Sequence, residues 1–171
     1  MSTKSDYTKD EWLLLYRIPG LVGAAVLAAD ESGMWGTTKE TFMLSKEWAK
    51  GVTEYPSNVL IQSLLKEKEG PEGDPMKDAY KDFKEDVKRR GLDQFTQDVV
   101  ADCGQAADLL DHKSSAEEAA GYKEWVMTIG RKVASVAKEK GSGSDKISDR
   151  EETLLNQVAK ALRFESQGSA V

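Results

Sequence analysis

Apolar side chains recur every three or four residues through most of this chain, and this spacing constrains its fold more than any other feature. Two clear series are Leu92, Phe95, Val99, Cys103, Ala106 and Leu110, then Tyr122, Val126, Ile129, Val133 and Val136. Such steps place the side chains on one face of an α-helix. No segment shows the alternation expected of a half-buried strand. The sequence therefore predicts an all-α protein.

Reciprocal capping boxes mark where several helices should begin. In such a box a Ser or Thr hydroxyl accepts from the N–H three residues later, and the Glu at that position accepts from the first N–H. The pattern occurs at Thr8–Glu11, at Thr37–Glu40, at Ser114–Glu117 in register with Ser115–Glu118, and at Ser148–Glu151. Asp74–Pro75 offers a different start, with Asp as cap and Pro in the first helical position.

Spacing and caps together predict helices over 9–30, 38–50, 57–68, 75–89, 92–111, 116–139 and 149–163. We expect the first to be broken or kinked at Pro19. A chain of 171 residues can bury an ordinary core in one domain. We predict a single helical-bundle domain over 1–164, with candidate pseudo-symmetric halves at 8–68 and 75–164 and a flexible tail at 165–171.

Composition excludes several classes of site. The chain has one cysteine, Cys103, and one histidine, His112, which rules out an intramolecular disulfide and the usual Cys/His zinc frameworks. The net charge of −6 argues against non-specific nucleic-acid binding, so we expect no nucleic-acid partner. Cys103 lies in an apolar series without an activating neighbour, and we interpret it as a core residue.

The segment Trp12 to Ala29 is apolar enough to suggest a membrane span. It carries Arg17 near its middle, beside Pro19 and Gly20, and these residues are poorly suited to lipid. Acidic residues precede it, where a signal peptide has basic ones. We therefore predict a buried core segment, no stable membrane insertion and a cytoplasmic location. Peripheral membrane attachment through this segment remains an alternative.

A similar arrangement occurs twice along the chain. Ala28-Ala-Asp-Glu-Ser-Gly33 is followed by the Thr37–Glu40 box, and Val136-Ala-Lys-Glu-Lys-Gly141 is followed by the Ser148–Glu151 box. In this the chain resembles the tellurite-resistance TerB-like family of small all-helical domains. Their members often show an alanine-rich helix, Ala-Asp-Gly, a short loop, and Ser or Thr with a Glu soon after.

This resemblance implies a non-enzymatic binding or scaffold protein linked to stress, with an oxygen-ligand site for calcium or magnesium at the inter-helix loops. Carried over by position, the ligands are Asp30 and Glu40 in the first unit and Glu151 in the second. The second unit departs from the pattern, because Lys138 stands where an acid is expected. The simpler interpretation is that Glu40 and Glu151 act as capping-box residues and that Asp30 is a solvated acid.

A second set of polar residues supports an alternative function, that of an enzyme. Asp108, Asp111 and His112 lie three and four residues apart, so they can share one helix face as an acidic cleft of an enzyme or of an accessory subunit. A solvated helix end explains the same residues without chemistry.

Trp35 differs from the other tryptophans in its sequence context. Trp12, Trp48 and Trp125 fall within helical patterns and are predicted core residues, whereas Met34 and Trp35 lie between two glycines. The pair is a candidate anchor for a protein partner if exposed, or a plug under the loop if buried. We expect a protein partner, which includes the formation of a homo-oligomer.

Overall fold

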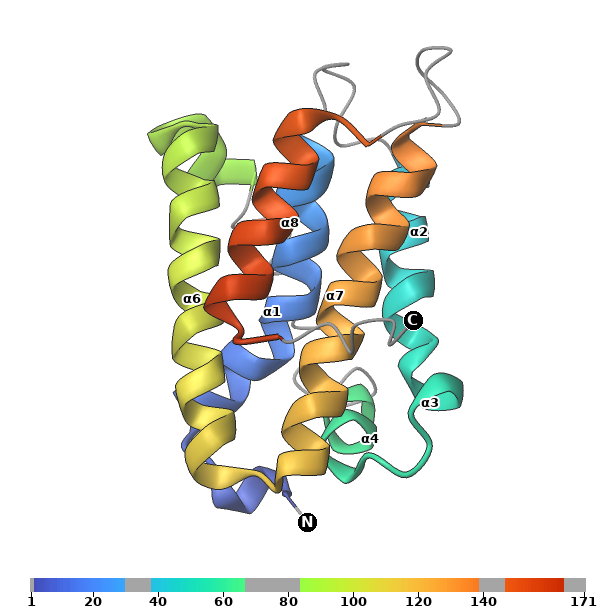
Figure 1. Cartoon of the computed structure of the whole chain (residues 1–171), viewed down its shortest axis with the longest axis vertical. Helices are drawn as coiled ribbons and strands as arrows, with labels where there is room; N and C mark the ends of the chain where they lie inside the picture. The colour runs from blue at the N-terminus through green and yellow to red at the C-terminus, as the bar shows by residue number, and fades with distance from the viewer. Residues whose placement is uncertain (1, 30–37, 67–83, 139–146, 165–171) are drawn as a thin grey trace, which may run out of the picture.

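The computed structural model describes residues 2–29, 38–66, 84–138 and 147–164, with only the backbone described for 38–43 and 136–138. These residues form one helical bundle without strands (Figure 1). A 3-10 turn, Lys4–Asp6, precedes the α-helices, which are α1 (Lys9–Ala29), α2 (Thr38–Ala49), α3 (Gly51–Glu54), α4 (Val59–Lys66), α6 (Leu92–Lys113), α7 (Ala116–Lys138) and α8 (Asp149–Ala161). The predicted all-α class and bundle of about seven helices are confirmed.

Most predicted helix limits agree with the structure to within one or two residues. Residues 84–90, the described part of the helix predicted over 75–89, are helical. The short helix α3 was not predicted. The helix predicted from residue 57 begins at Val59, because the Asn58 side chain accepts the backbone N–H of Ile61 at 3.1 Å and so acts as its cap.

α1 is the central helix of the bundle. It packs against α2, α6, α7 and α8, and Figure 1 shows it behind α8, in the gap between α8 and α7. Leu15, Ile18, Val22 and Val26 are fully buried, which explains why this segment is apolar on nearly all sides. By length and composition α1 could also cross a membrane, and 72% of its most apolar window is buried in the bundle.

Of the predicted break or kink at Pro19, the break does not occur. α1 runs without interruption from Lys9 to Ala29 with Pro19 inside it. Proline lacks the N–H that would bond to the carbonyl of Leu15, four residues earlier. The buried hydroxyl of Tyr122 in α7 donates to that carbonyl at 2.6 Å. A distant side chain thus replaces the missing backbone donor, and the helix continues.

The predicted core residues are confirmed. Trp12, Trp48 and Trp125 are at most 4% exposed. The Trp48 ring lies between the rings of Tyr16 and Trp125, at centroid distances of 5.3 and 5.9 Å. Burial raises the pKa of the Cys103 thiol to about 12, so this cysteine is an inert core residue.

The capping boxes of α1, α7 and α8 also form as predicted. Glu11 accepts from the N–H of Thr8 at 2.7 Å, and Glu151 accepts from that of Ser148 at 2.9 Å. At α7 the structure selects the Ser115–Glu118 register, while Ser114 ends α6 and its hydroxyl bonds to Tyr7. Thr37, Asp74 and Pro75 lie outside the described residues.

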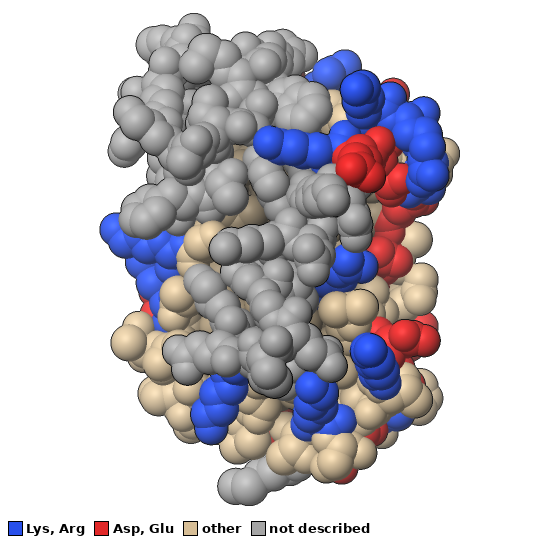
Figure 2. Space-filling view, turned by 180° about the vertical axis from the view of Figure 1, so that it is seen from behind, with Lys and Arg blue, Asp and Glu red and all other residues tan. Residues whose placement is uncertain are grey.

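Charges of both signs share one edge of the molecule. Figure 2 shows basic and acidic side chains next to one another along the edge formed by α6 and residues 84–90. Asp86 pairs with Arg89 at 2.7 Å, and Arg90 pairs with Asp98 at 2.8 Å. In the described part of this edge, charges of the two signs lie next to one another.

Candidate functional site

Glu151 is the predicted site residue whose environment the structure describes most fully. It lies in the first turn of α8 and is only 2% exposed. Its Oε2 atom accepts from the N–H and the hydroxyl of Ser148 at 2.9 and 2.8 Å. Its Oε1 atom is buried and has no hydrogen-bond partner among the described residues. An unsatisfied buried acceptor of this kind costs about 1–3 kcal/mol, and more when it is charged.

The other predicted cation ligands, Asp30 and Glu40, adjoin helix ends in the sequence, but their side chains are not described. Figure 1 shows that α1 ends, and α2 and α8 begin, at one end of the molecule. Asp30 directly follows the last residue of α1 and lies outside the described residues, and the side chain of Glu40 in α2 is not described either. Met34 and Trp35 also fall outside the described part. Within that part, no group of three or more His, Cys, Asp and Glu could hold a metal ion.

The structure gives Asp108 and Asp111 a structural partner. Arg163, which follows α8, pairs with both carboxylates and lies 2.6 Å from that of Asp111. Lys123 also donates to Asp111 at 3.0 Å, and this hydrogen bond, followed by that of Arg163, lowers the pKa of Asp111 against the opposing effect of burial. The exposed His112 ring lies 2.7 Å from the Asp108 carbonyl. These contacts tie α8 to α6 and α7.

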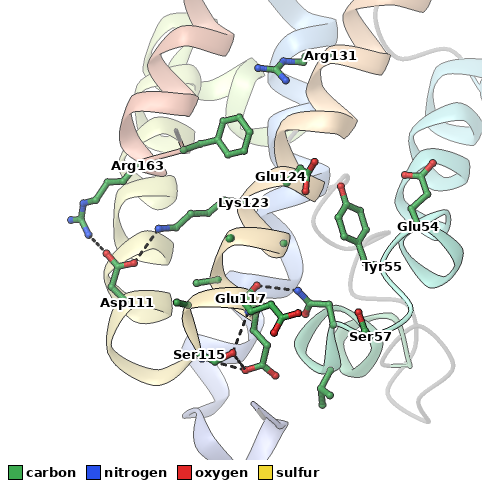
Figure 3. Close-up of a pocket in the computed structure, with 18 residues that line it drawn as sticks. Glu54, Tyr55, Ser57, Asp111, Ser115, Glu117, Lys123, Glu124, Arg131 and Arg163 are labelled. Carbon is green, nitrogen blue, oxygen red and sulfur yellow. Dashed lines mark hydrogen bonds and ion pairs between the residues drawn. The ribbon is translucent and has the colours of Figure 1, made fainter. Parts of the chain in front are cut away.

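A large cleft opens along α7, and we call it the α7 cleft (Figure 3). Its volume is about 1060 Å³. One wall is the segment Glu54–Val59, which joins α3 to α4. The other wall and the floor come from the end of α6, from the outer face of α7 and from the residues after α8, including Asp111, Ala116, Glu117, Ala120, Gly121, Lys123, Glu124, Arg131, Arg163 and Phe164.

Two hydrogen bonds fix the first wall of the α7 cleft in place. Asn58 donates to the carbonyl of Glu118 in α7 at 3.0 Å. This close approach requires Gly121, because a Cβ atom there would lie 2.5 Å from the Asn58 amide nitrogen. Gln62 donates to the carbonyl of Tyr55 at 3.0 Å and so anchors the bend before α4. The wall is therefore held by bonds to buried or half-buried groups and is preformed.

The two sides of the α7 cleft differ in charge. On one side, Lys123 and Arg163 both point to Asp111, and their charges are compensated (Figure 3). On the other side lie the exposed carboxylates of Glu54, Glu117 and Glu124. Among the described residues, none of these three acids takes part in an ion pair.

Tyr55 lies on the acidic side, near Glu54 and Glu124 in Figure 3. Burial raises the pKa of Tyr55, a hydrogen bond with Thr128 opposes this, and the charges of Glu124 and Glu54 add to the rise. On the opposite wall, the Arg131 guanidinium lies 5.7 Å from the centre of the Phe164 ring. The α7 cleft thus combines an aromatic group on each wall with an excess of negative charge on one.

No protein-family model, curated protein or solved structure matches the chain. The resemblance to TerB-like proteins therefore stays a prediction. Sequence reasoning did not identify the α7 cleft. The seven-residue spacing of Glu117, Glu124 and Arg131 is visible in the sequence, but nothing local indicates that residues 54–59 form a wall beside it.

Proposed function

We propose that this protein is a non-enzymatic helical binding protein that holds a divalent cation, calcium or magnesium, at the bundle end where α8 begins. The observation that carries this proposal is the buried Oε1 atom of Glu151, for which the described part of the chain supplies no hydrogen-bond partner. Hard cations prefer oxygen ligands and need several of them. One buried carboxylate fits that preference, and α1 ends and α2 begins at the same end of the bundle. The sequence places the predicted ligands Asp30 and Glu40 next to these two helix ends.

The enzymatic alternative receives less support. It requires free acid–base groups around Asp108, Asp111 and His112. Arg163 and Lys123 engage the two carboxylates in ion pairs. The proposal is therefore a binding function, and a cytoplasmic location and a link to stress remain part of it as expectations from the sequence.

To test the proposal, metal-free protein is titrated with Ca²⁺, Mg²⁺ and Mn²⁺, and the melting temperature is measured at each concentration. A cation at a hundred times its dissociation constant adds about 2.7 kcal/mol to the free energy of unfolding. Glu151→Gln should abolish the rise, because it removes the charge while Gln still serves in a capping box. Glu152→Gln, at the exposed neighbouring position, is the matched control and should leave the rise unchanged.

The proposal fails if none of the three cations raises the melting temperature of the wild-type protein. It also fails if Glu151→Gln responds like Glu152→Gln. A variant with both Asp30→Asn and Glu40→Gln tests the predicted partners separately. If this variant keeps the full rise, the site contains Glu151 without them.

A further inference from the structure

We propose that the α7 cleft binds a basic helical segment of a partner protein. This inference does not depend on the cation proposal, because the α7 cleft lies between the α3–α4 segment and α7, away from Glu151 at the start of α8 (Figures 1 and 3). It rests on the size of the cleft, on the spacing of its charged residues and on their lack of compensating partners.

The size of the α7 cleft favours a polypeptide over a small molecule. Its volume of about 1060 Å³ lies at the upper limit of small-molecule sites, which range from about 300 to 1,000 Å³. Two exposed small residues, Ala116 and Ala120, lie along its floor. A helix backbone can approach such a floor closely, as in helix-in-groove recognition.

The charged residues of the floor follow one line along α7. Glu117, Glu124 and Arg131 are spaced by seven residues, so they lie on nearly the same face of the helix. The line from Glu117 to Arg131 covers fourteen residues (131 − 117), about 21 Å of helix. A partner helix lying along it would meet two negative charges and then one positive charge.

The negative charges are available to a partner. Among the described residues, Glu54, Glu117 and Glu124 form no ion pair, whereas the cations Lys123 and Arg163 are already held by Asp111. Arg131 contacts the Phe164 ring and no described carboxylate. A complementary helix therefore carries Lys or Arg at two positions seven residues apart, facing Glu117 and Glu124, and Asp or Glu a further seven residues along, facing Arg131. The helix can run parallel or antiparallel to α7.

Two helical peptides of about 20 residues with this charge pattern, one for each direction, test the proposal. Their binding to the full chain is measured by fluorescence anisotropy at low and physiological salt. A third peptide has the same composition, with the charges moved so that the seven-residue spacing is lost. We expect one patterned peptide to bind at least tenfold more tightly than this control, and its affinity to fall with salt.

A charge exchange places the peptide in the α7 cleft. Glu124→Lys should weaken binding at least tenfold, and replacing the central Lys of the peptide by Glu should restore it. Glu152→Lys, an exposed change on α8 outside the cleft, is the matched control and should alter the affinity less than twofold. Circular dichroism checks that both variants keep the helical content of the wild-type protein.

Three results would overturn the proposal. The first is equal binding of the patterned and control peptides, which would indicate attraction to the net negative charge alone. The second is an equal effect of Glu124→Lys and Glu152→Lys, and the third is the absence of binding by either patterned peptide at low salt. Self-association that Glu124→Lys abolishes would identify a second copy of this chain as the occupant and would also contradict a basic partner.

Discussion

The capping boxes of α7 and α8 have the same local geometry, and they differ in what completes them. In both, a buried Glu in the first turn accepts from the N–H and hydroxyl of a Ser three residues earlier. Glu118 of α7 also accepts from Ser2, whose N–H lies 2.8 Å from Oε1 and whose hydroxyl lies 2.9 Å from Oε2. Glu151 of α8 has no such second donor at Oε1 within the ranges that the structure describes.

This difference shows that a capping box has two parts: one carboxylate oxygen is bonded within the first turn of the helix, and the other depends on tertiary contacts. The box satisfies one carboxylate oxygen through residues that are close in sequence. The second oxygen depends on whatever the fold brings to it. At α7 the fold brings the N-terminal segment, 116 residues away, and the box joins two parts of the chain. At α8 the same oxygen is available to a ligand.

The largest loss of stability should come from Glu118→Gln, and the same change at Glu151 should cost much less. In Glu118→Gln, either orientation of the amide places its NH₂ against a backbone N–H, of Ser2 or of Ser115. We expect a loss of about 2 kcal/mol in the free energy of unfolding. In metal-free protein, Glu151→Gln should cost less than about 1 kcal/mol, since its NH₂ can take the place of Oε1 where no donor opposes it.

Urea denaturation of the two variants measures this contrast directly. Equal losses for Glu118→Gln and Glu151→Gln would show that the completing donor from Ser2 contributes nothing. The comparison between the two capping boxes would then lose its basis.

Tyr122→Phe should have the next largest effect, because it removes another distant donor. The change leaves the Leu15 carbonyl buried without its hydrogen bond, at a cost of about 1–2 kcal/mol. In a Pro19→Ala background the restored backbone N–H should supply that bond, and the cost of Tyr122→Phe should fall. A double-mutant cycle from urea denaturation measures the coupling, and its absence would contradict our explanation of the uninterrupted helix.

The pH dependence of stability should also distinguish Glu118. Burial tends to raise its pKa, but the hydrogen bonds from Ser2 and Ser115 together outweigh this and lower the pKa below its ordinary value. A group with a lowered folded-state pKa stabilises the protein above its unfolded-state pKa, and this contribution is lost as pH falls through the folded-state value. Below about pH 4.5 the wild-type protein should therefore lose stability more steeply than Glu118→Gln. Parallel pH profiles from urea denaturation would contradict this.

The smallest effect should come from the exposed third box. Glu11 accepts from the N–H of Thr8 at 2.7 Å and pairs with Lys113 at 2.6 Å, but a quarter of its side chain is exposed. Water can replace these partners, so Glu11→Gln should change the free energy of unfolding less than Glu118→Gln or Tyr122→Phe does. A change as large as that of Glu118→Gln would show that burial does not govern the value of a capping box.

Local signals in the sequence predicted most of the fold. Apolar spacing and caps placed α6, α7 and α8 nearly to the residue, because both signals act within one or two turns of a helix. The helix is not broken at Pro19, because a donor from α7 replaces the missing N–H. Likewise, the sequence offered both Ser114 and Ser115 as caps, and the structure uses Ser115, whose partner Glu118 is also the acceptor for Ser2.

The candidate sites depended more on tertiary structure. Glu151 could be named from its capping box, but its burial and its unpartnered oxygen follow from packing. The α7 cleft could not be predicted at all. Its wall depends on the bond from Asn58 to the carbonyl of Glu118, sixty residues away, and on the absence of a side chain at Gly121.

Isothermal titration calorimetry with Ca²⁺ and Mg²⁺ tests the central claim most directly, namely that a cation completes the box of α8 as Ser2 completes the box of α7. The account predicts one binding site per chain in the wild-type protein and in Glu152→Gln, and none in Glu151→Gln. Heats of binding that are the same in Glu151→Gln and in the wild-type protein, or no binding to the wild-type protein at all, would contradict it.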